Sequence, residues 1–185
     1  NVCEWHPTNL SKLVETDGAV ATLVRLLSDP SKFVACTAIG VVADFLVYPV
    51  IKRLFVETES GLPELAVKLS DNAWEVKADA CRAIANLCTG GVSRDEERLR
   101  SHVGAQQTLM DSLVPRLADS ERLAARRQAV AAVGALCSNR HHANQQRFFS
   151  QPSAVTHLVA CICNADQELQ RNAIWALGGV CDGAP

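Results

Sequence analysis

The segment ETDGAVATLVRLLSDP at residues 15–30 contains the pattern that determines the fold. Its glycine, Gly18, recurs as Gly61 and Gly104, so the glycines lie 43 residues apart. After each glycine the apolar residues return at intervals of three and four, which is typical of an amphipathic helix. Each run then ends in a short polar turn that contains an aspartate. A sequence that repeats itself at this period predicts a stack of similar helical units.

A second and longer apolar run follows each polar turn. The apolar residues of ACRAIANL, residues 80–87, share one face of a predicted helix, and similar runs are centred on Ala38, Ala132 and Ala176. Strand-like alternation of apolar and polar residues is missing from the sequence, so we predict an all-α fold. Nine apolar residues are expected in the core: Leu23, Leu27, Ile39, Ile84, Leu87, Val133, Leu136, Ile174 and Leu177.

The composition is that of an ordinary globular domain. Among 185 residues, 48% are hydrophobic, 21% are charged, and the net charge is −2. These values exclude a disordered or collagen-like chain and give no overall bias towards nucleic acid or an anionic membrane. Residues 33–51 are strongly apolar, but Asp44 and Pro49 interrupt them, so we expect core structure there and no transmembrane segment.

The eight cysteines lie mostly inside apolar runs, as Cys88 and Cys137 do. Cysteine at such positions behaves as a small hydrophobic residue, and unpaired thiols are typical of a reducing compartment. We therefore expect an intracellular protein, cytoplasmic and/or nuclear.

The sequence shows no arrangement of residues that would carry out catalysis. Gly90 and Gly91 lack the lysine and serine or threonine of a phosphate-binding loop. His157, Cys161 and Cys163 include two types of soft-metal ligand, but thiols on adjacent sides of a helix fit a tetrahedral site poorly. We expect no enzyme, no cofactor and no metal site.

The two kinds of run resemble the armadillo repeat. That family's pattern is E-x-G-a-[vi]-x-x-L-[vi]-x-L-L, followed by a turn with Asp and by A-x-x-A-[il]-x-N-L. Residues 15–27 match its first part with one extra residue between Glu15 and Gly18, and residues 80–87 match its second part. The resemblance implies an all-α, armadillo-type α-solenoid, a right-handed superhelix of three-helix repeats. The repeats are expected at residues 18–60, 61–103, 104–152 (with longer loops) and 153–185 (truncated at its C-terminal end), and residues 1–17 are expected to be the tail of a preceding repeat.

The predicted solenoid has no visible polar cap at either end. Terminal repeats need such a cap for solubility. We therefore expect either a longer parent protein with further repeats or self-association of the fragment through its uncapped ends.

The resemblance also implies that the third helices of the repeats line a concave groove that binds extended protein segments. In the family's best-known form, asparagines flanked by tryptophans grip the peptide, but only Asn86 and Trp175 match these positions. This difference argues against a nuclear-import adaptor. Arginines occupy the same face instead, which favours an acidic or phosphorylated segment, unless the face is simply solvated. The expected partner-binding residues are Asp79, Arg82, Asn86, Arg127, Gln128, Arg171, Asn172 and Trp175.

The function favoured by this reading is a non-catalytic scaffold for a protein or peptide partner, without direct nucleic acid contact. Two alternatives remain open. One is a co-chaperone-like module that binds the nucleotide-binding domain of a heat-shock 70 protein, and the other is a regulatory domain that senses a small anionic ligand. If the basic face is not used, the linkers at residues 89–102 and 138–153 are the next candidates for a binding surface.

Overall fold

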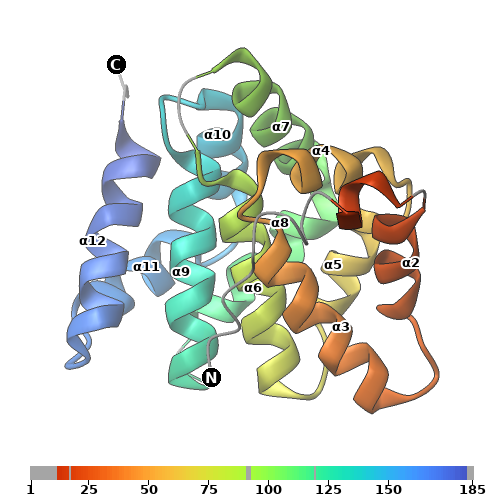
Figure 1. Cartoon of the computed structure of the whole chain (residues 1–185). Helices are drawn as coiled ribbons and strands as arrows, with labels where there is room; N and C mark the ends of the chain where they lie inside the picture. The colour runs from red at the N-terminus through yellow and green to blue at the C-terminus, as the bar shows by residue number, and fades with distance from the viewer. Residues whose placement is uncertain (1–11, 17, 91–92, 119, 183–185) are drawn as a thin grey trace.

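The computed structural model describes residues 12–16, 18–90, 93–118 and 120–182. Within these ranges the regular elements are all helices, and no strand occurs (Figure 1). They are α2 (Ala19–Leu26), α3 (Lys32–Phe45), α4 (Pro49–Glu57), α5 (Gly61–Leu69), α6 (Trp74–Cys88), α7 (Arg94–Ala105), α8 (Gln107–Leu113), the short 3-10 helix η1 (Val114–Leu117), α9 (Leu123–Cys137), α10 (His142–Ser150), α11 (Ala154–Ile162) and α12 (Gln167–Cys181).

The four long helices α3, α6, α9 and α12 stand side by side in chain order and form one layer (Figure 1). The shorter α2, α5 and α11 each pack on the long helix that follows them, and η1 packs on α9. The helices α7 and α10 pack against each other along one edge of the layer. The chain is therefore a linear stack of helical units, as its repeats predict.

Local signals in the sequence start several of these helices. Gly18 precedes α2 with a φ of 72°, a left-handed conformation that glycine adopts without steric cost. Ser93 and Glu96 form a reciprocal capping box at the start of α7. Asp166 caps α12 by accepting a hydrogen bond of 2.8 Å from the Leu169 N–H.

Side chains of α7 and α10 cap the C-terminal ends of the long helices, whose last carbonyls have no partner within the helix. Arg100 donates to the Cys88 carbonyl of α6. Asn144 donates to the Leu136 carbonyl of α9 at 2.9 Å. Gln145 donates to the Gly179 carbonyl of α12 at 2.8 Å. These polar residues are almost fully buried, so the edge helices hold neighbouring units together.

The linkers expected at residues 89–102 and 138–153 are mostly helical, which corrects their interpretation as loops. α7 occupies most of the first and α10 most of the second. Their sequences are polar because much of each helix faces solvent and because their buried side chains cap other helices.

The predicted core is confirmed for six of its nine residues, which are between 0% and 1% exposed: Leu27, Ile39, Ile84, Leu87, Val133 and Leu136. Leu23 is half-buried. Ile174 and Leu177 were wrongly assigned to the core, since they are 55% and 38% exposed. Both lie on the side of α12 that no described helix covers.

No helix in the described ranges combines the length and apolar character needed to cross a membrane. The apolar run at residues 33–51 is divided between α3, which ends at Phe45, and α4, which begins at Pro49.

Candidate partner-binding face

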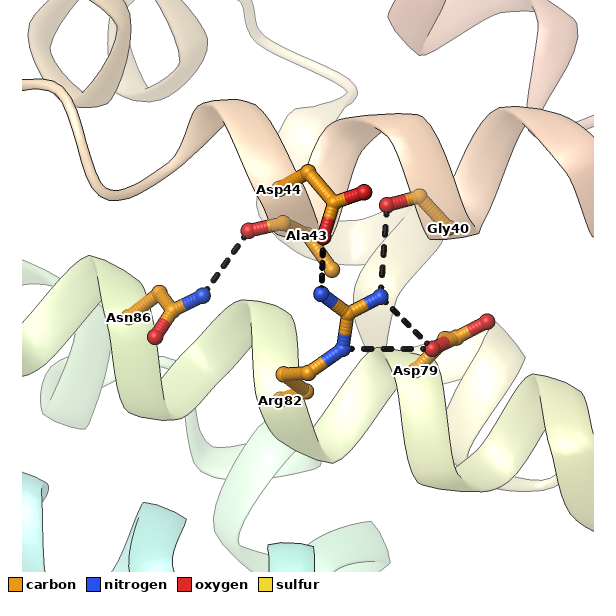
Figure 2. A network of polar contacts seen from close by, with 6 residues as sticks. All are labelled: Gly40, Ala43, Asp44, Asp79, Arg82 and Asn86. Carbon is orange, nitrogen blue, oxygen red and sulfur yellow. Dashed lines mark hydrogen bonds and ion pairs between the residues drawn. The ribbon is translucent and has the colours of Figure 1, made fainter. Parts of the chain in front are cut away.

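Arg82 lies at the centre of a polar network between α3 and α6 (Figure 2). Its guanidinium contacts the Asp44 carboxylate of α3, pairs with Asp79 Oδ1 at 2.9 Å and donates to the Gly40 carbonyl at 3.4 Å. Burial alone would lower the pKa of Arg82, but the hydrogen bonds to Asp44 and Asp79 outweigh burial and raise it. Arg82 therefore links two repeats and has its charge matched within the chain.

Asn86 makes a second link between the same helices, one turn further along α6 (Figure 2). Its Nδ2 donates to the Ala43 carbonyl of α3 at 2.9 Å. The amide is half-buried, and its Oδ1 is an acceptor that a bound segment can use.

Arg127 links α9 to the start of α12. Its Nε donates to Asp166 Oδ1 at 2.9 Å, its Nη2 pairs with Asp166 Oδ2 at 2.5 Å, and its Nη1 pairs with Glu168 at 2.8 Å. The hydrogen bond from Arg127, together with that from the Leu169 N–H, holds the pKa of the Asp166 carboxyl below its ordinary value. Asp166 thus caps α12 and anchors α12 to α9 at once.

Trp175 packs across Gly134 of α9. A Cβ atom at Gly134 would lie only 2.3 Å from Cζ3 of the Trp175 ring, so a residue without a side chain is required there. At the equivalent position on α3, two junctions earlier, the Gly40 carbonyl accepts a hydrogen bond from Arg82 of α6. The ring of Trp175 nevertheless remains 51% exposed, which leaves much of its surface available to a partner.

Three further predicted residues lie on the same helices. Gln128 of α9 and Asn172 of α12 are half-buried, and Arg171 of α12 is exposed. Asp79, Gln128 and Asn172 occupy the same repeat position on consecutive long helices. We call the eight predicted residues together the ladder face.

The ladder face contains three arginines and one aspartate, but carboxylates beside it match the charge of two of these arginines. Arg82 and Arg127 are each paired with two carboxylates. Asp79 belongs to the predicted set, whereas Asp44, Asp166 and Glu168 do not. Arg171 is the exposed arginine of the predicted set. The recurrence of glycine at the equivalent positions 40 and 134 is a sequence signal for the close approach of a side chain from the next long helix, which is Asp79 at Gly40 and Trp175 at Gly134.

The cysteines of the predicted soft-metal candidate do not converge. Cys161 is buried and donates to the Leu117 carbonyl at 3.4 Å, whereas Cys163 is exposed. Among the described residues, no group of three or more potential ligands is placed to hold a metal ion. Burial raises the pKa of the Cys88 and Cys137 thiols to about 12, which makes them packing residues and poor nucleophiles.

An open hollow of about 480 Å³ adjoins Trp175. It is lined by Ser138, Gly178, Gly179, Cys181 and Asp182 besides the tryptophan. The lining contains a carboxylate but no cation, so it does not fit a small anionic ligand.

Comparison with known proteins supports the repeat assignment. The sequence pattern of the armadillo/beta-catenin-like repeat matches residues 144–182, which extend from α10 to the end of α12. A search of curated proteins found no match.

Solved structures match most of the chain. An engineered protein aligns with a TM-score of 0.78 at 22% identity, covering 89% of this chain and 63% of its own. A designed armadillo repeat protein in complex with the peptide (KR)4 aligns with a TM-score of 0.79 at 26% identity, covering 96% of this chain and 70% of its own. Computationally designed armadillo repeat proteins for modular peptide recognition give the same values. The chain thus spans about two thirds of the length of these structures and shares their fold.

Proposed function

We propose that this chain, which is an armadillo-repeat protein, is a non-catalytic scaffold that binds an extended protein segment along α6, α9 and α12. One observation carries the proposal, namely that hydrogen-bonding side chains recur at the same repeat position on three packed helices. These side chains are Asp79, Gln128 and Asn172. Two designed relatives are described as a peptide complex and as modular peptide recognisers, which supports this use of the fold.

The spacing of the helices suits an extended segment. Packed helices lie about 8–10 Å apart, and an extended chain advances about 3.3 Å per residue. Each helix of the ladder face therefore meets about every third residue of a bound segment. Asn86 and the exposed ring of Trp175 lie near the two ends of this path and can contact the backbone and an apolar side chain.

We propose that an acidic or phosphorylated residue of the segment pairs with Arg171. Arg82 and Arg127 are less suitable, because an incoming anion would have to compete with two carboxylates at each of them. Arg171 is exposed, and its guanidinium can bind a carboxylate or phosphate through two hydrogen bonds.

A peptide-binding assay tests this proposal. Matched extended peptide libraries with a central glutamate, phosphoserine or lysine are selected on the wild-type protein, and affinities are measured by fluorescence anisotropy. We expect the anionic peptides to bind and Arg171→Glu to weaken them at least about tenfold, since an opposed charge costs more than about 1.4 kcal/mol here. Arg98→Glu on α7, where the arginine is 81% exposed, is the matched control and should bind normally. Stronger selection of lysine peptides, or equal loss in both variants, would contradict the proposal.

The charge and the cysteines of the chain bear on its partners and its location. We propose a protein partner and no direct nucleic acid contact, because the net charge is −2 and because Arg82 and Arg127 are paired with carboxylates of the chain itself. We also propose an intracellular location, cytoplasmic or nuclear, because no cysteine in the described part forms a disulfide.

A further inference from the structure

The side of α12 that faces away from α9 exposes apolar side chains together with its neighbour α11. Ile174 and Leu177 on α12 are 55% and 38% exposed, and Val155 and Val159 on α11 are 48% and 47% exposed. We call these four residues, with Gly178, the end face. An apolar surface of this kind is typical of an interaction site.

The same repeat positions are buried on α9, the neighbouring long helix. Ile174 and Leu177 correspond to Val130 and Val133 on α9, which are both 0% exposed, and α9 packs between α6 and α12. Gly178 corresponds to Gly134, which Trp175 covers, whereas a Cβ atom at Gly178 would meet nothing within 4 Å. The end face is therefore a helix-packing surface of the kind that the chain uses internally.

We propose that the end face is covered by the end face of a second copy of this chain, with the two α12 helices antiparallel. A two-fold arrangement of this kind makes every contact twice and is the commonest symmetry of soluble dimers. When the helices cross near Leu177, the bulk of Ile174 meets the empty space over Gly178 of the second copy.

Charge complementarity favours this antiparallel arrangement. Arg171 lies near the start of α12 and Asp182 directly after its end, and both are exposed. Asp182 Oδ1 also lies 3.5 Å from Arg140 Nε, an exposed ion pair in which the carboxylate can accept a second cation. With the helices antiparallel, Arg171 of one copy lies opposite Asp182 of the other. The equivalent residue in the preceding repeat, Arg127, already pairs across a junction with Asp166 and Glu168. The position therefore serves as a link between packed units elsewhere in the chain.

This inference goes beyond the proposed peptide binding but shares Arg171 with it. Arg171 can pair either with Asp182 of the second copy or with an anionic segment, but not with both at once. An anionic peptide is therefore expected to favour the monomer.

The oligomeric state of the protein alone tests the dimer, without any peptide. Sedimentation equilibrium over tens to hundreds of micromolar should give twice the mass of the chain. Ile174→Glu should give a monomer, because it places a charge in the apolar contact, while circular dichroism should show a folded protein since Ile174 is exposed. Phe33→Glu on α3, where the side chain is 81% exposed, is the matched control and should remain dimeric.

A charge exchange tests the antiparallel register. Arg171→Asp should weaken the dimer, and Arg171→Asp combined with Asp182→Arg should restore it. A wild-type monomer would mean that another partner or chain segment covers the end face, and it would overturn the proposal. A dimeric Ile174→Glu variant, or failure of the charge exchange to restore dimerisation, would overturn it as well. None of these results depends on peptide binding, so the two proposals can fail separately.

Discussion

Trp175 of α12 lies across Gly134 of α9, and the absence of a side chain at residue 134 is what allows the two helices to pack with the ring between them. The contact fixes the ring on the ladder face while leaving it 51% exposed. The same contact therefore stabilises the packing of α12 on α9 and positions a residue of the surface that we propose for binding.

Gly134→Ala should destabilise the protein. A methyl group there would overlap the Trp175 ring sterically, and overpacking of this kind costs about 1–3 kcal/mol. Gly178→Ala is the matched control, because its methyl group meets nothing within 4 Å and alanine is favoured over glycine in a helix by about 1 kcal/mol. Urea unfolding at low protein concentration, where the protein is monomeric, measures both when it is followed by circular dichroism. Equal effects of the two substitutions would contradict the packing of Trp175 on Gly134.

Leu87→Ala should cost about 2–5 kcal/mol of unfolding free energy, because it leaves a cavity in the middle of the stack. Ile174→Ala, which truncates an exposed side chain, should cost less than about 1 kcal/mol in the monomer. Thermal and urea unfolding at low protein concentration compare the two. A large loss with Ile174→Ala under these conditions would place that residue in the core after all.

The link between Arg82 and Asp44 should show a measurable coupling energy. A double-mutant cycle with Arg82→Gln and Asp44→Asn isolates it, and we expect about 0.5–1 kcal/mol because both side chains are partly solvated. The coupling should fall when salt is added. A coupling energy of zero at low salt would show that the pair of Arg82 and Asp44 drawn in Figure 2 does not hold α6 to α3.

The helices and their order could be predicted from the sequence because the repeat places apolar residues at helical spacing. Pairing of side chains between repeats could not, since Arg82 and Asp44 are 38 residues apart and no local pattern connects them. The exposure of Ile174 and Leu177 was also missed, because an apolar helical face looks the same whether or not another helix covers it. The edge helices α7 and α10 were taken for linkers because their buried residues are polar and act as caps.

Stability should fall as the solution is acidified below the ordinary pKa of histidine. His141 accepts a hydrogen bond from the Asn144 N–H through Nδ1, and its Nε2 lies 2.7 Å from Ser101 Oγ. Burial, with Arg100 and Arg147 nearby, lowers its pKa below 6.5 in the folded state. The unfolded chain therefore binds a proton more readily, so the contribution of neutral His141 is complete above pH 6.5 and is lost as the pH falls towards the folded-state pKa.

Urea unfolding between about pH 7.5 and pH 5.5 measures this dependence. His141→Asn keeps a side chain that can cap α10 but does not titrate, so the variant should lose less stability over that range than the wild type. An unchanged pH dependence in the variant would assign the effect to other groups.

The central claim, that a segment lies along three consecutive long helices, is tested most directly by nuclear magnetic resonance. An anionic peptide selected as described above is titrated into isotope-labelled protein while the side-chain amides and the tryptophan indoles are observed. We predict that the amides of Asn86, Gln128 and Asn172 and the indole of Trp175 shift together with one affinity. Shifts confined to α4 and α7, or to one helix of the ladder face, would contradict the account.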